Sequence, residues 1–453
     1  MHASQRLVQS VDAAEEIAEY QRQNPTSLSR FEAAKTVIPG GNTRLTAYFA
    51  PYPFYAVRGE GCRLYDLDGN VRLDFYNNAT SLLFGHAYPP VVAAITAQAS
   101  LGTAFAVPTE PEVALAKLLV GRIPTVDGIR FTNSGTEAVQ FAIRAARVFT
   151  GREKIAKFEG GYHGTADPVS ISVTPELALS GEARRPSAVP ASAGITQHTV
   201  EDVVILPFND LEGTTTLLRA YQAELAAVIV EPVLGSCGYV PARPEFLQGL
   251  RQLTKQLGLL LIFDEVQTFR LSMGGAQALL GIEPDLTVLG KIIGGGLPVG
   301  AVGGRREVMA AFDATAGTPK IPHAGTFNGN PVTMCAGLAT LQGLSAATYD
   351  QLNQMGDEVR QREQELCRRY DVPVQVTGEG SLFGLHWSAE PVTDYRSAAR
   401  ANKSLSYKFF LHGLNNGIFF TTRGGGCLSI PMTASELGAF LDVLESFLKK
   451  ITT

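Results

Sequence analysis

The chain of 453 residues is too long for one ordinary domain, and its 45% hydrophobic and 18% charged residues suit two or three domains with buried cores. A net charge of −5 without any run of lysines or arginines argues against a nucleic-acid partner. No segment offers the roughly 20 apolar residues that span a bilayer, and the N-terminus lacks the apolar stretch of a signal peptide. Five scattered cysteines without a CxxC pair indicate a reducing compartment, so we expect a cytoplasmic protein with neither a membrane partner nor a metal site.

The N-terminal part of the chain has the pattern of a peripheral segment. Residues 4–22 carry the spacing of an amphipathic helix. The stretch GEGCRLYDLDGNVRLDF alternates apolar and polar residues around an Asp-Gly pair, which predicts a hairpin. We therefore assign residues 1–75 to an N-terminal segment that packs with a small C-terminal domain.

From about residue 110, short apolar runs alternate with stretches of helix length. Strands that are buried on both faces read as continuous apolar runs, and six runs fit this pattern: GIRF, KIAKF, VVIL, AAVIV, LLLIF and LTVL. Helices are predicted over 137–149 and 244–257. The alternation predicts a large α/β domain around a mostly parallel sheet, over residues 76–335.

After about residue 335 the pattern changes to long polar helices and fewer strands. VPVQVTGEGSLFGLHW and GIFFTT are typical of strands, and the last helix begins at the capping box formed by Thr433 and Glu436. We predict a smaller α+β domain over residues 336–453.

Ligands of open parallel sheets bind beyond the carboxyl ends of the strands, where four segments carry suggestive side chains. FTNSGTEA passes through Ser134, Gly135 and Thr136 into a helix. The free N–H groups and hydroxyls there suit a phosphate, although an ordinary helix cap has the same pattern. KFEGGYHGT places Tyr162 and His163 in a glycine-rich turn, where an aromatic ring can cover a planar ligand or simply pack within the loop.

The third segment, LLLIFDEVQ, ends an apolar strand with Asp264 and Glu265. An acid at this place can bind a metal, hold a cationic nitrogen or cap the next element. If the acid binds a metal, the segment is typical of the magnesium-binding strand of a nucleotide hydrolase. This interpretation is disfavoured because the chain contains no GxxxxGKS or GxxxxGKT loop.

Lys291 follows the run LTVLG, about one strand-helix-strand unit after Asp264, so both side chains are expected in one crevice. Burial disfavours the ammonium form and makes a lysine a usable nucleophile, whereas a lone lysine at a strand end more often reaches solvent. A phosphate cup, an aromatic ring, an acid and an amine together meet the chemical needs of pyridoxal phosphate.

At these residues the sequence resembles the class III, pyridoxal-phosphate-dependent aminotransferases of fold type I, from about residue 30 to the C-terminus. Six signatures fall in the family's order: FTNSGTEA, GGYHG, IVEPV, LLIFDEV, LGKIIGGGLPVGAVGG and HAGTFNGNPV. The resemblance implies an α/β fold with a mostly parallel sheet in the large domain and a smaller α+β C-terminal domain.

The resemblance also implies roles for individual residues. Lys291 is expected to form a Schiff base with pyridoxal 5'-phosphate and later to move a proton as general base. Asp264 is expected to keep the pyridine nitrogen protonated. The other expected cofactor contacts are the phosphate cup of Ser134, Gly135 and Thr136, and the ring contacts Tyr162 and Val266.

In relatives, the threonine that matches Thr326 reaches the phosphate of the neighbouring subunit. The resemblance therefore implies an obligate homodimer whose active sites lie at the interface and are shared between the subunits.

Within the class, the resemblance is strongest to glutamate-1-semialdehyde 2,1-aminomutases and to β-amino acid aminotransferases. Arg44 matches an arginine that binds a substrate carboxylate, and Arg423 matches one that β-amino acid aminotransferases use for the carboxylate of the 2-oxo acid. Two guanidinium groups suit an enzyme that accepts two carboxylates in turn, although both could be solvent-exposed loop arginines. Ala79 stands where these relatives usually place tryptophan or tyrosine, which predicts a wider pocket.

We therefore predict an aminotransferase that moves an amino group from an amino acid to a 2-oxo acid, such as pyruvate or 2-oxoglutarate, by a ping-pong mechanism. β-Amino acids are among the candidate donors. The alternative is intramolecular amino transfer of the glutamate-1-semialdehyde aminomutase kind. Racemase, decarboxylase and phospholyase activities share the fold, and a binding protein with a vestigial cofactor site is a further alternative.

Overall fold

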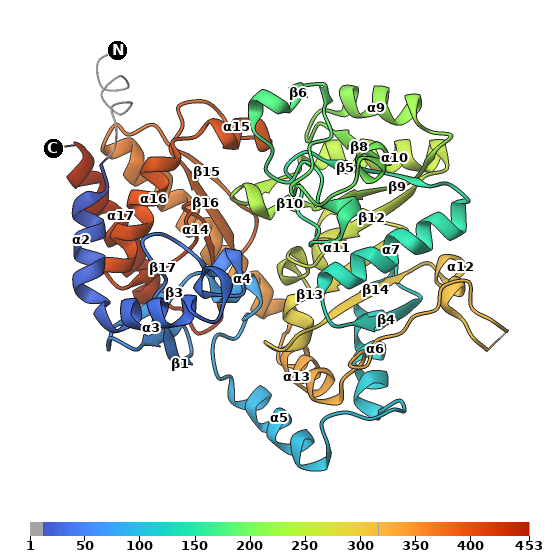
Figure 1. The fold of residues 1–453 in the computed structure, drawn as a ribbon, viewed down its shortest axis with the longest axis horizontal. Coiled ribbons are helices and arrows are strands. Elements are labelled where there is room, and N and C mark those ends of the chain that lie inside the picture. Colours follow the sequence, from blue (N-terminus) through green and yellow to red (C-terminus); the bar gives the residue numbers. More distant parts are fainter. Residues whose placement is uncertain (1–11, 316, 453) are drawn as a thin grey trace. The chain divides into compact units, whose positions relative to one another are not determined.

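The computed structural model describes residues 12–315 and 317–452, which form two compact units (Figure 1). One unit contains Pro89–Asn353 together with the short piece Thr393–Ala399. The other contains the chain up to Tyr88, Gln354–Val392 and the chain from Arg400 onward. We call them the sheet unit and the terminal unit. The part of the predicted N-terminal helix that precedes residue 12 lies outside the described residues.

The sheet unit is built on a seven-stranded sheet with the order β4-β14-β13-β12-β9-β5-β8. β14 is antiparallel to both of its neighbours, and the remaining neighbours pair in parallel. The mostly parallel sheet predicted from the sequence is therefore confirmed. The strands, in that order, are β4 (Gly128–Thr132), β14 (Gly300–Gly304), β13 (Leu286–Gly290), β12 (Leu260–Asp264), β9 (Leu225–Val230), β5 (Lys154–Phe158) and β8 (Val203–Leu206).

All six apolar runs form strands of this sheet, whereas the sequence did not predict β14. Its sequence, GAVGG, lacks the large apolar side chains of its neighbours. A Cβ atom on Gly300 would stand 2.0 Å from the carbonyl oxygen of Ser134, so the strand runs where side chains have no room. Close packing of the backbone, which an apolar pattern does not reveal, explains the omission.

Helix α7 (Gly135–Thr150) lies along this sheet and contacts β13 and β14 (Figure 1). Its buried face is rich in alanine, which brings the helix axis close to the strands. The other helices of the sheet unit are α5 (Pro89–Leu101), α6 (Glu110–Arg122), α8 (Gln197–Glu201), α9 (Leu211–Ala220), α10 (Pro244–Leu257), α11 (Gly275–Leu280), α12 (Arg306–Met309) and α13 (Pro331–Gln342). Short strand pairs β6 (Gly181–Glu182) with β7 (Arg185–Pro186), and β10 (Val233–Leu234) with β11 (Val240–Pro241), complete it.

The terminal unit has two small sheets, with the orders β1-β2-β3-β17 and β15-β16-β18. The predicted hairpin is present, because β2 and β3 pair antiparallel on either side of Asp68 and Gly69. The strands are β1 (Ala56–Glu60), β2 (Arg63–Asp66), β3 (Val71–Asp74), β15 (Gln375–Thr377), β16 (Leu382–His386), β17 (Ile418–Phe419) and β18 (Gly426–Cys427).

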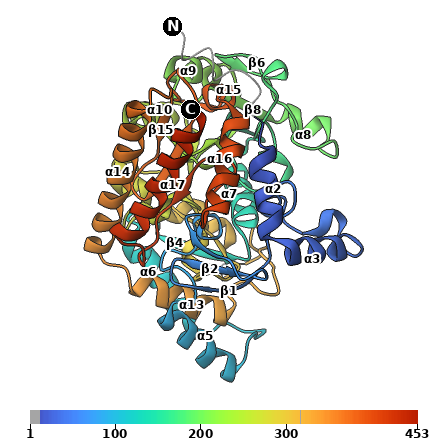
Figure 2. The same cartoon turned by 90° about the vertical axis from the view of Figure 1, so that its left-hand side faces the viewer.

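Helices from both ends of the chain pack together in the terminal unit. Figure 2 shows α2 (Ala14–Gln23) beside α16 (Lys403–Asn415), which in turn contacts α17 (Ala434–Thr452). The predicted capping box of α17 is present, since the Thr433 N–H donates to Oε2 of Glu436 at 2.9 Å. The terminal unit also contains α3 (Pro25–Lys35) and most of α14 (Ala346–Arg369), whose first residues belong to the sheet unit. Helix α15 (Tyr395–Arg400) lies largely in the sheet unit.

A left-handed helical turn, α4 (Asn77–Thr80), follows β3. Its four residues have φ angles of 48, 48, 56 and 72°, which cost non-glycine residues roughly 1–2 kcal/mol each. Asp74 accepts a hydrogen bond from the Asn77 N–H at 2.8 Å, and the Asn77 side chain donates to the carbonyl oxygen of Cys427 at 3.0 Å. Strain held in this way is concentrated at functional sites, and Ala79 lies in the turn.

Within the described ranges, no helix combines the length and apolar character needed to traverse a bilayer.

Candidate active site

Asp264 and Lys291 lie at the carboxyl ends of adjacent strands. Asp264 is the last residue of β12, and Lys291 directly follows β13 with a left-handed φ of 49°. The two strands pair in parallel, with Asp264 opposite Val288. The structure therefore places the acid and the amine at one edge of the sheet, as the order of the strands along the chain suggested.

The segment from Ser134 to Thr136 forms the beginning of α7 at the same edge. Ser134 is the N-cap, and its hydroxyl accepts the Glu137 N–H at 3.2 Å. A Cβ atom on Gly135 would stand 3.1 Å from Cγ2 of Val266, the second residue after Asp264. The helix start and the Asp264 strand end are therefore in direct contact, and glycine at 135 allows that approach.

The glycine-rich turn after β5 joins these elements. The Nδ1 atom of His163 lies 2.8 Å from Oδ2 of Asp264, and both side chains are buried. Burial lowers the pKa of His163 despite the opposing effect of Asp264, so the imidazole is neutral and donates its Nδ1–H to the carboxylate. The Thr165 N–H donates to the hydroxyl of Thr136 at 3.2 Å, which fixes this turn against the start of α7.

Glu231 is a site residue that the sequence interpretation missed. It follows β9, is 5% exposed, and its Oε2 atom accepts the Tyr162 N–H at 2.8 Å. Burial raises the pKa of Glu231 to about 8, with the charge of Asp264 adding to the rise and that of Lys291 opposing it. An acid within the apolar run AAVIVEPV was the available signal, because unpaired carboxylates are seldom buried.

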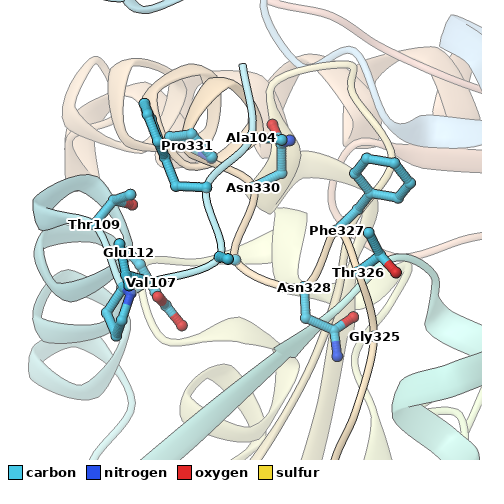
Figure 3. Close-up of a pocket in the computed structure, with 14 residues that line it drawn as sticks. Ala104, Val107, Thr109, Glu112, Gly325, Thr326, Phe327, Asn328, Asn330 and Pro331 are labelled. Atoms are coloured by element: carbon cyan, nitrogen blue, oxygen red, sulfur yellow. The ribbon is translucent and has the colours of Figure 1, made fainter. Parts of the chain in front are cut away.

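Thr326 lies in the loop that precedes α13 in the sheet unit. It lines a cavity of about 410 Å³ between residues 104–112 and residues 325–331. Figure 3 shows Thr326, Phe327 and Asn328 on one side of this cavity, with Val107, Thr109 and Glu112 on the other.

Arg44 and Arg423 both lie in the terminal unit and are exposed. The Nη1 atom of Arg44 donates to Oδ1 of Asn78, in the left-handed turn, at 2.8 Å. Burial raises the pKa of Tyr76, whereas the positive charges of Arg44 and Arg423 both lower it. The fold therefore brings the two arginines, far apart in sequence, into the surroundings of one tyrosine.

The residues at the sheet edge fit pyridoxal phosphate. A helix start with two hydroxyls suits the phosphate, a hydrogen-bonded carboxylate suits the ring nitrogen, and a lysine amine suits the aldehyde. Gly135, where a side chain would close the space beside Val266, leaves room at the phosphate end. Across residues 12–315 and 317–452, no group of three or more His, Cys, Asp or Glu side chains is arranged to hold a metal ion.

Comparison with known proteins decides the family. The profile described as aminotransferase class-III matches residues 48–435. The chain belongs to the class III aminotransferases. It is a pyridoxal-phosphate-dependent enzyme, and the predictions of family, fold and cofactor are confirmed.

Individual class III relatives differ in their reactions. A protein of Brevibacillus brevis named glutamate-1-semialdehyde 2,1-aminomutase 2 is 43% identical over 95% of this chain and 99% of its own length. The structure of an omega-transaminase from Sphaerobacter thermophilus is 48% identical, with a TM-score of 0.91 over 94% of this chain and 98% of that one. A β-phenylalanine aminotransferase from Variovorax paradoxus is 37% identical, with a TM-score of 0.88 over 97% of each chain.

Proposed function

We propose that this enzyme transfers an amino group from an amino acid, including β-amino acids, to a 2-oxo acid by a ping-pong mechanism. The observation that carries the proposal is that the fold brings Arg44 and Arg423 near Tyr76, where the positive charges of both lower the pKa of the tyrosine against the effect of burial. The Nη1 atom of Arg44 is held there by Oδ1 of Asn78. Two guanidinium groups in one neighbourhood suit two carboxylates that bind in turn. Similarity to an omega-transaminase and to a β-phenylalanine aminotransferase supports this choice of substrates. Its five cysteines are scattered and form no CxxC pair, which agrees with a reducing location such as the cytoplasm.

In this proposal Lys291 and Asp264 are the catalytic residues. Bound pyridoxal phosphate supplies an aldehyde and an electron-withdrawing ring that stabilises negative charge on the substrate carbon. The Lys291 amine would hold the cofactor, and once the substrate has displaced it the amine would act as general base that moves the proton between the substrate carbon and the cofactor. The Asp264 carboxylate holds a proton on the ring nitrogen, and His163 orients the carboxylate.

The other cofactor contacts follow from their places at the sheet edge. Ser134, Gly135 and Thr136 bind the phosphate with N–H groups and hydroxyls at the start of α7. Tyr162 would lie against one face of the ring and Val266 against the other, so that together they would fix the plane of the ring.

The homodimer is part of the same proposal. Phe105, Val107 and Phe327 are 48%, 68% and 58% exposed and gather around the cavity beside Thr326 (Figure 3). Apolar side chains at this exposure favour coverage by a second copy, whose phosphate site would receive Thr326. The Asn133 side chain donates to Oδ1 of Asn328 at 2.8 Å, so this loop is anchored next to the phosphate cup of its own chain.

The decisive experiment is a half-reaction of the cofactor-loaded enzyme with a β-amino acid, an α-amino acid or a simple amine. We expect the visible absorption band of the cofactor to disappear with the β-amino acid and to return on addition of a 2-oxo acid. Arg423→Leu should raise the KM for the 2-oxo acid roughly 10- to 100-fold and leave the first half-reaction nearly unchanged. Arg362→Leu, which removes an exposed arginine of α14, is the matched control.

Intramolecular amino transfer is the second candidate, because the Brevibacillus brevis relative carries an aminomutase name. It predicts turnover of glutamate-1-semialdehyde without any acceptor. If the three amines leave the band unchanged while glutamate-1-semialdehyde is consumed alone, the transaminase proposal is wrong. Lys291→Ala should abolish multiple turnovers in either case, and full activity of that variant would remove Lys291 from the mechanism.

A further inference from the structure

The peptide bond between Gly161 and Tyr162 is held at both of its polar ends by buried ionisable side chains. Its C=O group, on Gly161, accepts a hydrogen bond from Nζ of Lys157 at 2.9 Å. Its N–H group, on Tyr162, donates to Oε2 of Glu231 at 2.8 Å. Lys157 is fully buried and Glu231 is 5% exposed.

Both side chains come from rigid parts of the sheet unit. Lys157 lies in β5, which pairs in parallel with β8 and β9, and its Nζ atom also donates to the carbonyl oxygen of Ile171 at 2.6 Å. Glu231 directly follows β9, and its Oε1 atom accepts the Gly235 N–H at 3.4 Å. The two strands therefore determine where the peptide plane lies.

A buried lysine and a buried glutamate are costly in an apolar sheet, so their presence calls for a reason. A hydrophobic pair would fill the same volume at lower cost. What only polar groups can do here is fix the rotation of one peptide plane in a glycine-rich turn, where Gly160 has a left-handed φ of 82°. The nitrogen of this peptide belongs to Tyr162, so the orientation of the plane affects the direction of the Tyr162 side chain.

We propose that Lys157 and Glu231 are positioning residues that clamp the Gly161–Tyr162 peptide and thereby set the orientation of the Tyr162 ring against the cofactor. The inference rests on the proposed function, in which Tyr162 covers one face of the cofactor ring. Neither side chain is required to touch the cofactor. Rotation of a single peptide plane would redirect the ring, and misplacement of about 1 Å in an active site can cost about 100-fold in rate.

Because of the protonation state of Glu231, the positioning effect of its hydrogen bond can be measured separately from any effect of a negative charge. Burial raises the pKa of Glu231 to about 8, so at pH 7 the carboxyl is mostly neutral and still accepts the Tyr162 N–H. Glutamine has the same shape and the same acceptor oxygen. Glu231→Gln should therefore preserve the clamp, whereas Glu231→Leu should abolish it.

The experiment measures the visible circular dichroism of the bound cofactor, its dissociation constant, and kcat and KM of the holoenzyme. We expect Glu231→Leu and Lys157→Met to weaken the dichroic band and to weaken cofactor binding about tenfold, and kcat should change by a larger factor than KM. Glu231→Gln should stay within about twofold of wild type in all of these quantities. The two damaging changes should not add in the double variant, because both release the same peptide. Glu363→Leu is the matched control, since that glutamate is equally buried and no hydrogen bond to its carboxyl oxygens is found in the described structure.

Each outcome decides the inference. A folded Glu231→Leu variant with the wild-type dichroic band and cofactor affinity would overturn it, and so would equal damage from Glu231→Gln. If Glu231→Leu does not fold, Lys157→Met carries the same test. Tyr162→Ala distinguishes the two levels: if this variant keeps the wild-type band, the proposed role of Tyr162 fails, whereas a changed band with unaffected clamp variants refutes the clamp alone.

Discussion

Glu363, on α14, offers a quantitative test of burial in the terminal unit. The side chain is fully buried, and neither carboxyl oxygen has a hydrogen-bond partner in the described structure. Burial raises the pKa of Glu363 from 4.5 to about 8, with Arg360 only partly opposing the rise. The folded protein therefore holds a proton on Glu363 that the unfolded chain releases above pH 4.5.

The sign of the pH dependence follows directly. Because the folded state binds the extra proton, the stability associated with Glu363 is complete below pH 4.5 and is lost as the pH rises through 8. The loss is about 1.4 kcal/mol for each pH unit, or about 2 kcal/mol between pH 6.0 and 7.5. For a folding unit of 150–250 residues this corresponds to roughly 4–8 °C in Tm.

The assay compares thermal unfolding of wild type and Glu363→Gln at pH 6.0 and 7.5 by far-ultraviolet circular dichroism. Glutamine keeps the shape and cannot ionise, so we expect the variant to gain those 4–8 °C relative to wild type at the higher pH. Glu365→Gln removes an exposed carboxylate from the same helix and should show no such gain. A difference between wild type and Glu363→Gln that is the same at both pH values would refute the reasoning.

Three further predictions test other parts of the chain. Burial raises the pKa of Glu16, but its partners, Lys450 among them, lower it to about 2, so stability is present above pH 4.5 and is lost as the pH falls towards 2. Glu16→Gln should therefore lower the free energy of unfolding by roughly 1–2 kcal/mol at pH 7, after allowance for the solvent exposure of Lys450, and by much less near pH 2.5 in denaturant titrations. Gly135→Ala should weaken cofactor binding several-fold in equilibrium dialysis, because the added Cβ atom would stand 3.1 Å from Cγ2 of Val266. Burial lowers the pKa of His323 to about 4, so the neutral ring accepts a hydrogen bond from Nε of Arg130, and its Nε2 atom lies 3.2 Å from Nδ2 of Asn328 in the loop beside Thr326. His323→Phe should loosen this loop and raise the dissociation constant of the proposed homodimer about tenfold in sedimentation experiments.

The sequence was informative wherever burial leaves a local pattern. The six apolar runs became strands because both faces of the central sheet are covered, and the rule of strand ends put Asp264 and Lys291 at one edge. β14 gave no such pattern, because its small residues fit against the backbone of neighbours such as Ser134.

Contacts between distant segments could not be predicted in the same way. The positive charge of Arg423 lowers the pKa of Tyr76 because β17 pairs with β3, and each of the two residues follows its strand by a few positions. The sequence of neither strand indicates which strand it pairs with. The clamp residues Lys157 and Glu231 were missed for a related reason: each looks like an isolated charge in an apolar run, and the group they share is a peptide bond on a third segment.

The pairing of β3 with β17 has a consequence for how the protein is made. Leu73 leaves the ribosome long before its ladder partner Ile418, a delay of roughly 20–70 s at ordinary rates of synthesis. During that interval the edge of β3 in the nascent hairpin has no native strand to pair with, whereas every strand of the seven-stranded sheet emerges within one continuous stretch. The seven-stranded sheet can therefore complete its ladder hydrogen bonds on the ribosome, and the sheet that contains β3 and β17 must wait until synthesis is nearly complete.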